Sequence, residues 1–233
     1  MGGKKDNAIK RTLRSLLIDL SMKTRLLDES VFELYKYMFS PTQLIFLTKC
    51  LTECKMVPGC FVEVGCAYGW TTAFLKKFMD ENQIEKNYYA IDTFKGFLPK
   101  HSRYEIEQRN KDSVIQNVFS LNKRKWFEYS LMISKLTGIA IIEADATKFN
   151  FNRIGPIAFA LLDLDLYIPT LDVLPKLYSN LSPGGIILVD DCLDNNLWDG
   201  SFAAYSKFVA EADLEANIVL RKIGIIRKIK NGA

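Results

Sequence analysis

Short apolar runs alternate with amphipathic stretches along most of the chain from residue 60 onward. Runs of β-branched and aromatic residues predict strands, and apolar residues spaced three and four apart predict helices. Strands are expected at residues 60–64, 88–91, 139–142, 157–162, 186–189, 218–220 and 224–229. Helices between them are expected at residues 70–79, 170–180 and 202–211. This alternation predicts an α/β fold with a doubly wound, mostly parallel seven-stranded sheet and an antiparallel edge hairpin.

The chain before residue 57 has a helical pattern throughout. Residues 8–20 and 30–56 predict helices, and Ser40-Pro41-Thr42 interrupts the second and restarts it, because proline is favoured in a first helical turn. The chain is therefore divided into an N-terminal helical segment, residues 1–56, and an α/β domain, residues 57–233. The helical segment is expected to cover the sheet or to contact another subunit, and we expect a homodimer.

An insert of about 40 residues, 98–138, separates the second and third expected strands and is longer than an ordinary connection. It is rich in aromatic and polar side chains. At the ligand-binding edge of a parallel sheet, such an insert predicts a lid or an acceptor-binding segment. The alternative is one or two surface helices with Trp126 buried beneath them.

Composition and charge exclude several classes of protein. The 233 residues are 48% hydrophobic and 25% charged, which is typical of a globular domain. No run approaches the about 18–20 apolar residues of a membrane helix, and Leu16-Leu17-Ile18 is too short for a signal peptide, so a cytoplasmic protein without a membrane partner is expected. The net charge of +4 is carried largely by the chain ends, which we interpret as solvated, and no nucleic-acid partner is expected. The C-terminal basic residues are Arg221, Lys222, Arg227, Lys228 and Lys230.

The first expected strand ends in a glycine-containing turn. Gly65 follows the strand, and Ala67 stands where a dinucleotide-binding motif would carry its second glycine. That motif brings backbone N–H groups against a pyrophosphate, which the Glu63 carboxylate would repel. Glu63 suits a positively charged ligand instead, and S-adenosylmethionine carries an ammonium and a sulfonium but no phosphate. The turn therefore favours S-adenosylmethionine over NAD.

Acidic residues also follow the second and third expected strands. Asp92 lies about 20–30 residues after the glycine turn, where an acidic side chain can accept hydrogen bonds from the ribose hydroxyls. It could equally cap the next turn or helix. Asp145 could accept a hydrogen bond from the adenine amino group, or could likewise cap the turn that follows it.

Four aspartates follow the fourth and fifth expected strands. Asp163 and Asp165 follow one strand, and Asp190 and Asp191 follow the other. These strands are expected to be neighbours, so Asp163, Asp190 and Asp191 should converge at one edge of the sheet. Like charges this close raise each other's pKa, and a hard divalent cation with oxygen ligands relieves the repulsion. The pattern predicts a Mg²⁺ site, the alternative being acidic loop ends that face water.

In their order and spacing, these motifs resemble the macrocin O-methyltransferase (TylF-type) family of class I S-adenosylmethionine-dependent methyltransferases. The resemblance runs from about residue 57 to residue 208. Its most specific parts are Pro-Gly-x-Phe-Val-Glu-x-Gly at 58–65, Asp-Thr-Phe-Lys-Gly-Phe at 92–97, Asp-Leu-Asp-Leu-Tyr at 163–167 and Leu-Ser-Pro-Gly-Gly at 181–185. The resemblance implies a Rossmann-like methyltransferase sheet and an enzyme that methylates sugar hydroxyls, notably deoxysugars on natural products.

The resemblance also implies roles for individual residues. It implies that Asp163, Asp190 and Asp191 bind Mg²⁺ and that Asp165 is the general base. The complete expected cofactor site is Glu63, Gly65, Tyr68, Thr71, Asp92, Thr93, Asp145 and Asp163. A related catechol-methylating group carries a lysine three residues after the first metal-binding aspartate, where this chain has Leu166, which disfavours a catechol substrate.

The function that these expectations favour is Mg²⁺-dependent transfer of a methyl group from S-adenosylmethionine to a sugar hydroxyl of a natural product or glycan. One alternative is a class I methyltransferase with a different acceptor, such as a small phenol or a nucleic acid. Salt-dependent binding to RNA or DNA would favour the nucleic acid. A second alternative is a non-catalytic module that binds an adenosine ligand. An NAD-dependent oxidoreductase is compatible with the fold alone, but Glu63 and Ala67 disfavour it.

Overall fold

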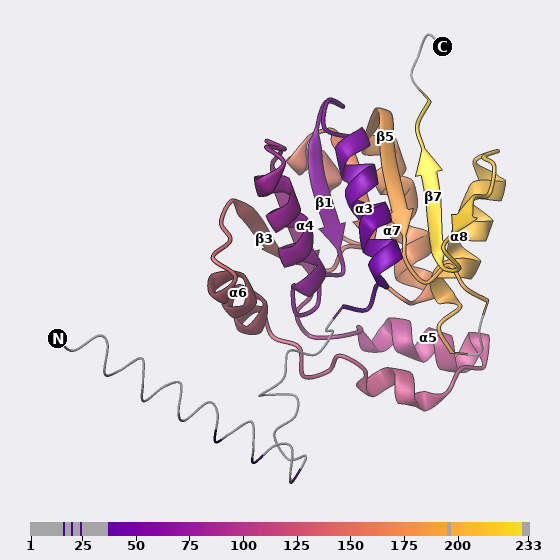
Figure 1. The fold of residues 1–233 in the computed structure, drawn as a ribbon. Helices are drawn as coiled ribbons and strands as arrows, with labels where there is room; N and C mark the ends of the chain where they lie inside the picture. Colours follow the sequence, from indigo (N-terminus) through magenta and orange to yellow (C-terminus); the bar gives the residue numbers. More distant parts are fainter. Residues whose placement is uncertain (1–15, 17–19, 21–23, 25–36, 195–196, 230–233) are drawn as a thin grey trace. The chain divides into compact units, whose positions relative to one another are not determined.

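The computed structural model describes residues 16, 20, 24, 37–194 and 197–229 (Figure 1). The chain divides into two units, Met1–Met38 and Phe39–Ala233, and each is described by itself. In the first unit Leu16, Leu20 and Thr24 are helical, and the remainder of the helices expected before residue 37 lies outside the described residues. Among the described residues, no helix has both the length and the apolar character needed to cross a lipid bilayer.

The second unit is a seven-stranded sheet with helices on both faces (Figure 1). The strands are β1 (Cys60–Val64), β2 (Tyr88–Asp92), β3 (Ile139–Glu143), β4 (Ile157–Leu162), β5 (Leu181–Val189), β6 (Ile218–Val219) and β7 (Ile223–Arg227). The helices are α3 (Pro41–Glu53), α4 (Trp70–Glu81), α5 (Pro99–Arg109), α6 (Arg124–Ile133), α7 (Tyr167–Asn180) and α8 (Gly200–Glu211), with 3₁₀ turns η1 (Ser113–Asn117) and η2 (Phe151–Ile154). The strand order is β3-β2-β1-β4-β5-β7-β6, with β7 antiparallel to β5 and β6. The doubly wound sheet with an antiparallel edge hairpin is confirmed.

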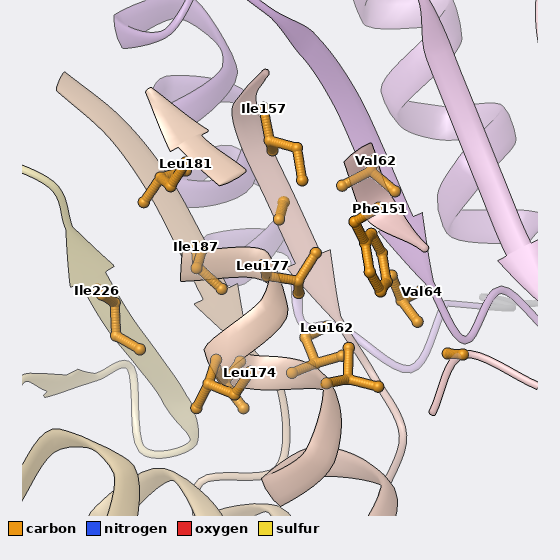
Figure 2. Close-up of a cluster of buried hydrophobic side chains, with 14 of the residues drawn as sticks. Val62, Val64, Phe151, Ile157, Leu162, Leu174, Leu177, Leu181, Ile187 and Ile226 are labelled. Carbon is orange, nitrogen blue, oxygen red and sulfur yellow. The ribbon is translucent and has the colours of Figure 1, made fainter. Parts of the chain in front are cut away.

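The alternation of side chains along β1 assigns its residues to the two faces of the sheet. Val62 and Val64 join the buried cluster that contains Leu174 and Leu177 of α7 (Figure 2). Glu63, between them, points to the opposite face, where the Thr72 hydroxyl of α4 donates to it. Because both faces are covered, chemistry in this unit is confined to the ends of the strands.

Helix α3 belongs to the same compact unit as the sheet. Ser40 and Gln43 form a capping box at its start, and Pro41 occupies its first turn. Leu47 and Leu51 are fully buried. This compact unit begins at Phe39 and includes α3, while the expected division between residues 56 and 57 stays a prediction.

Strand β5 is longer than the sequence predicts. Residues 182–185, expected as a tight turn, are part of β5. Gly184 has φ +84°, its N–H donates to the Lys228 carbonyl at 2.7 Å, and the register against β4 shifts at this point. The chain therefore passes through the two glycines as an irregular strand, which exchanges backbone hydrogen bonds with Lys228, just beyond β7.

The insert at residues 98–138 forms α5, η1 and α6, so the expectation of surface helices is confirmed. The expectation that Trp126 is buried beneath them is wrong, because its side chain is 38% exposed. The next residue, Phe127, is fully buried instead and contacts the Phe94 ring at a centroid distance of 5.3 Å. Helical spacing alone could not decide which of two adjacent aromatic residues faces inward.

Candidate functional site

The turn after β1 is built around Gly65, whose φ is +84°. A Cβ at this position would lie 1.8 Å from the carbonyl oxygen of Asp163, an approach that only glycine permits. The Asp163 N–H donates to the carbonyl of Val64 at 2.8 Å. The glycine turn and the loop after β4 are therefore in direct contact.

Asp92 fixes the same turn from the end of β2. Its Oδ2 accepts hydrogen bonds from the N–H groups of Cys66 and Ala67, both at 2.9 Å. Its Oδ1 accepts one from the N–H of Phe94 at 2.7 Å. Asp92 thus holds the backbone of both the turn after β1 and the loop after β2. Its binding of a ribose stays a prediction.

Glu63 lies beneath the turn and is 2% exposed. Its Oε2 accepts hydrogen bonds from the Thr72 hydroxyl at 2.6 Å and the Tyr88 hydroxyl at 2.8 Å. Burial raises the pKa of Glu63 to about 7, and these two hydrogen bonds oppose that rise. Glu63 is hydrogen-bonded to α4 and β2 and so supports the turn from below, while direct contact with a cofactor stays a prediction.

Replacing Glu63 by glutamine is expected to flatten the pH dependence of folding stability. The folded-state pKa of about 7 lies above the ordinary value of 4.5, so the neutral form is favoured in the folded protein. Its stabilising contribution is fully present below pH 4.5 and is lost as the pH rises through 7. Between pH 5 and pH 8, the urea-derived free energy of unfolding of the wild type should fall by about 3 kcal/mol more than that of Glu63→Gln. Glu81→Gln, on the exposed side of α4, is the control. Parallel profiles for wild type and Glu63→Gln would contradict the prediction.

Tyr68 and Thr71 lie where the glycine turn enters α4. The Tyr68 ring stacks against Trp70 and Trp126, with centroid distances of 5.4 and 6.1 Å. Its carbonyl accepts a hydrogen bond from the Ser130 hydroxyl of α6 at 2.7 Å. Thr71 is half-buried in the first turn of α4. Helix α6 therefore covers one side of the expected cofactor turn.

Thr93 and Asp145 are bonded within their own loops. The Thr93 hydroxyl donates to the Gly96 carbonyl at 2.9 Å. Asp145 Oδ1 accepts from the Thr147 N–H at 3.0 Å and hydroxyl at 2.7 Å, and its Oδ2 lies 3.3 Å from Lys100 Nζ. Partial burial raises the pKa of Asp145, but the Thr147 and Lys100 contacts outweigh it and hold the pKa below its ordinary value. Asp145 caps its turn, and an adenine contact stays a prediction.

The four aspartates after β4 and β5 form what we call the acidic cluster: Asp163, Asp165, Asp190 and Asp191. The register pairs Leu162 of β4 with Val189 of β5, so the two acidic loops begin side by side. One oxygen each of Asp163, Asp165 and Asp191 lie within 4.8 Å of one another. Asp165 and Asp191 have φ values of +59° and +54°, a backbone conformation that non-glycine residues adopt at a cost.

Protonation of the acidic cluster is strongly perturbed. Burial raises the pKa of Asp163 and Asp165 well above its ordinary range, and the neighbouring carboxylates raise it further. A side-chain hydrogen bond with Asp191 also favours the protonated form of Asp165. Burial and the charge of Asp191 raise the pKa of Asp190 to about 6, against the effect of Lys222. So many carboxylates are compatible with full ionisation only beside a cation.

Lys222 is a member of the site that the sequence interpretation missed. Its Nζ lies 2.8 Å from Asp190 Oδ2 and 3.1 Å from Asp191 Oδ1, and its side chain is 18% exposed. The expectation of a solvated basic C-terminus is therefore wrong for this residue. Arg227 pairs with Glu53 at 2.8 Å but is exposed, as expected of a solvated basic residue. Lys222 could have been found only from its position just before the last strand, β7. The sequence alone did not show that β7 pairs with β5.

The acidic cluster has donors that fit a hard divalent cation. All are carboxylate oxygens, the ligand type that Mg²⁺ prefers. Asp190 is 2% exposed, and its Oδ1 is buried without a hydrogen-bond partner among the residues that the structure describes, although its Oδ2 is paired with Lys222. An unpartnered buried carboxylate oxygen is costly unless a cation or a proton satisfies it.

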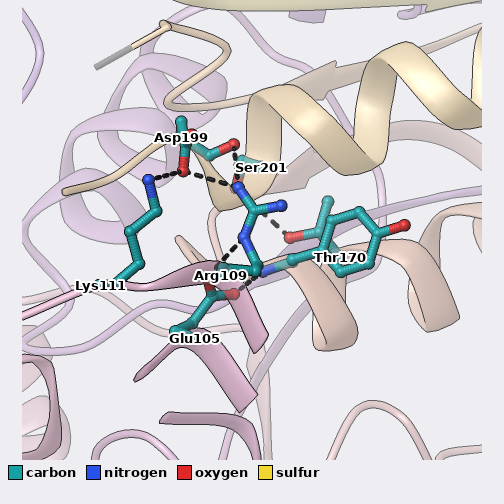
Figure 3. A network of polar contacts seen from close by, with 7 residues as sticks. Glu105, Arg109, Lys111, Thr170, Asp199 and Ser201 are labelled. Carbon is teal, nitrogen blue, oxygen red and sulfur yellow. Dashed lines mark hydrogen bonds and ion pairs between the residues drawn. The ribbon is translucent and has the colours of Figure 1, made fainter. Parts of the chain in front are cut away.

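A polar network joins α5 to the loop after β4 (Figure 3). Glu105 is 1% exposed and accepts a hydrogen bond from the Tyr167 N–H at 2.5 Å, in the first turn of α7. Its Oε2 accepts from Arg109 Nε at 2.7 Å, and Arg109 also donates to Asp199 Oδ1 at 2.7 Å. The first part of the insert is therefore fastened to α7 and to the start of α8.

Gly200 positions Asp165 from the start of α8. A Cβ on Gly200 would lie 2.5 Å from both the Asp165 carbonyl oxygen and the Tyr167 nitrogen. The next residue, Ser201, donates its N–H to the same Asp165 carbonyl at 3.2 Å, and its hydroxyl lies 3.3 Å from that of Thr170 (Figure 3). The loop that carries Asp165 is thus packed against a helix start with no room for a side chain.

Replacing Gly200 by alanine is expected to lower turnover by about ten- to a hundredfold, because a displacement of the Asp165 loop by a fraction of an ångström misaligns its carboxylate. Alanine favours a helix more than glycine does, so the helix itself is not weakened. Steady-state kinetics and calorimetric affinity for S-adenosylhomocysteine together check this. Unchanged turnover, or a loss of cofactor affinity equal to the loss of turnover, would argue against it.

Comparison with known proteins places this geometry in context. Residues 33–224 match the sequence model of a family described as macrocin-O-methyltransferase (TylF). A mycinamicin III 3''-O-methyltransferase from Micromonospora griseorubida is 24% identical over 144 residues, which are 58% of this chain and 56% of that relative. The chain thus matches little more than half the length of that relative.

Two solved structures share the fold. The O-methyltransferase NovP has a TM-score of 0.68 at 18% identity, over 83% of this chain and 82% of that one. The calicheamicin methyltransferase CalS11 has a TM-score of 0.62 at 22% identity, over 80% and 78% of the two chains. CalS11 is described as a TDP-rhamnose 3'-O-methyltransferase.

Proposed function

The chain belongs to the macrocin O-methyltransferase (TylF) family, and from this premise we propose that it transfers a methyl group from S-adenosylmethionine to a sugar hydroxyl in a Mg²⁺-dependent reaction. The observation that carries the proposal is the direct contact between the Gly65 turn and the loop of Asp163. A ligand on the turn would lie beside the acidic cluster, as methyl transfer to a metal-bound hydroxyl requires.

The cofactor would bind along the ends of β1 and β2. Gly65 allows the backbone to approach the ligand, and Tyr68 and Thr71 line the entry to α4. Asp92 and Thr93 lie at the end of β2, where Asp92 would accept one ribose hydroxyl at Oδ1, with the lone pair that its three backbone donors leave free. Glu63 lies below the turn, and in its ionised form it would suit a sulfonium better than a pyrophosphate.

The residues that would hold Mg²⁺ are Asp163, Asp190 and Asp191. The unpartnered Oδ1 of Asp190 and the close oxygens of Asp163 and Asp191 support this assignment; the third oxygen close to those of Asp163 and Asp191 belongs to Asp165. When bound, Mg²⁺ would supply positive charge that lowers the pKa of an acceptor hydroxyl. Asp165 would take the proton of that hydroxyl. The hydroxyl oxygen of the acceptor would then bond to the methyl carbon, and the methyl–sulfur bond would break with its electron pair left on sulfur.

The acceptor would be a sugar with neighbouring hydroxyls, on a natural product or a glycan. By their names, one relative is a 3''-O-methyltransferase of mycinamicin III and another is a 3'-O-methyltransferase of TDP-rhamnose, a nucleotide-linked sugar. At the position of the lysine in catechol-methylating enzymes, Leu166 is 1% exposed and packs into the core, which disfavours a phenolic acceptor. We further propose that the protein acts in the cytoplasm, as a homodimer, and without a nucleic-acid or membrane partner.

Calorimetric titration with S-adenosylhomocysteine, with and without Mg²⁺ and beside an NAD control, tests the cofactor assignment. We expect saturable binding of S-adenosylhomocysteine and no binding of NAD. A panel of nucleotide-linked and macrolide-linked deoxysugars, assayed with labelled S-adenosylmethionine, then tests the acceptor class. Preference for NAD, or methylation of phenols but of none of the sugars, would contradict the proposal.

A further inference from the structure

Lys222 places an ammonium directly against the acidic cluster. Its Nζ bridges Asp190 Oδ2 and Asp191 Oδ1, at 2.8 and 3.1 Å. The same ammonium lies 5.0 Å from the centroid of the Phe39 ring, a cation–π contact at the start of the compact unit. These contacts occupy one oxygen of each aspartate, and the other oxygen of Asp190 has no hydrogen-bond partner among the described residues.

The backbone holds Lys222 in this position at a conformational cost. The two residues before it, Leu220 and Arg221, have φ values of +49° and +75°. The Leu220 carbonyl accepts a hydrogen bond from Gln43 Nε2 of α3 at 3.0 Å, and the Lys222 carbonyl accepts one from the Cys192 N–H at 2.7 Å. A turn with two left-handed non-glycine residues persists only where its surroundings fix it, which indicates that the placement of this lysine is specified by the fold.

We propose that Lys222 is an internal counter-cation, which keeps Asp190 and Asp191 in place when no divalent ion is bound and weakens the affinity of the acidic cluster for that ion. The inference rests on the Mg²⁺ site proposed above. Carboxylates this close repel one another unless a positive charge lies nearby. The Lys222 ammonium supplies part of that positive charge permanently. The same charge repels an incoming cation, so the site is assembled before the ion arrives and the ion can exchange.

The test is the binding of Mg²⁺ and Mn²⁺ alone, measured by calorimetry and by the electron paramagnetic resonance of free Mn²⁺. Lys222→Met removes the charge but keeps a side chain of similar length against Phe39, and it should bind the ions about tenfold more tightly than the wild type. Lys222→Gln, which keeps a hydrogen-bond donor, should also bind more tightly. Lys222→Arg keeps the charge and should match the wild type, as should Arg221→Met, which removes an exposed charge from the same turn.

Thermal unfolding provides a second measurement that does not depend on activity. In a chelator, Lys222→Met should unfold about 5–10 °C below the wild type, because it leaves buried carboxylates unpaired. Mg²⁺ should restore most of this loss and should raise the unfolding temperature of the wild type far less. If Lys222→Met does not fold without metal, folding restored by Mg²⁺ supports the inference, and Lys222→Gln supplies the affinity comparison.

Equal or weaker ion binding by both Lys222→Met and Lys222→Gln would overturn the role of Lys222 and leave the Mg²⁺ site intact. Tighter binding by Lys222→Arg as well would also overturn it, because the charge would then not be the cause. If neither the wild type nor any variant binds a divalent ion, the Mg²⁺ site itself fails, and the inference fails with it.

Discussion

Replacing Asp163 by alanine is expected to lower methyl transfer at least about a thousandfold, because the loss of one metal ligand removes several kcal/mol of charge stabilisation. Asp163 contributes one of the closely spaced oxygens of the acidic cluster. The contacts of Gly65 and Val64 with Asp163 are made by the Asp163 backbone, so they should survive the substitution. Single-turnover kinetics with labelled S-adenosylmethionine measure the loss, and calorimetry should find the affinity for S-adenosylhomocysteine nearly unchanged.

Asp190→Ala is expected to give the same pattern, because its Oδ1 is the unpartnered buried oxygen of the site. Asp172→Ala is the matched control, because it also replaces an aspartate by alanine. Asp172 lies exposed on α7, away from the acidic cluster. The turnover of this control should equal that of the wild type. Activity retained in Asp163→Ala, or a parallel loss of cofactor affinity, would contradict the division between a metal site and a cofactor turn.

Replacing Gly65 by alanine is expected to lower cofactor affinity at least about a hundredfold by displacing the turn that meets the ligand. The new Cβ would lie 1.8 Å from the Asp163 carbonyl oxygen, so the two loops must separate. The positive φ of Gly65 adds backbone strain. Together they should destabilise the domain by about 2–4 kcal/mol, measured by urea unfolding.

Gly155→Ala separates these two effects. Gly155 has a similar φ of +79°, but a Cβ there would meet nothing within 4 Å. This control should lose about 1–2 kcal/mol from backbone strain alone and should bind S-adenosylhomocysteine like the wild type. Gly65→Ala could instead match Gly155→Ala in both stability and affinity for S-adenosylhomocysteine. The cofactor site would then not depend on close packing of the turn against Asp163.

The fold and the acidic cluster could be predicted from sequence because both follow from local patterns and simple topology. Alternating strands and helices specify a parallel sheet, and parallel neighbours bring their carboxyl ends to one edge. That reasoning is enough to predict that Asp163 and Asp191 meet, as they do. The predicted strand limits were close for β2 and β3, whose apolar runs end at acidic residues.

Features that depend on tertiary partners could not be predicted in this way. Lys222 reaches the cluster because β7 runs antiparallel beside β5, and nothing in its own neighbourhood indicates a carboxylate partner. Both oxygens of Asp92 are used by backbone N–H groups of two different turns. Residues 182–185 have the composition of a turn but continue β5, because Gly184 and Gly185 exchange backbone hydrogen bonds with Lys228. In each case a long-range contact outweighs the local preference.

The dependence of methyl transfer on a divalent ion tests the proposed chemistry most directly. Transfer from labelled S-adenosylmethionine to a sugar with neighbouring hydroxyls would be followed in the wild type, first after removal of metal with a chelator and then after addition of Mg²⁺. The acidic cluster predicts that transfer stops in the chelator and returns with Mg²⁺, while S-adenosylhomocysteine still binds. Transfer that continues undiminished in the chelator would contradict the assignment of Asp163, Asp190 and Asp191 as metal ligands.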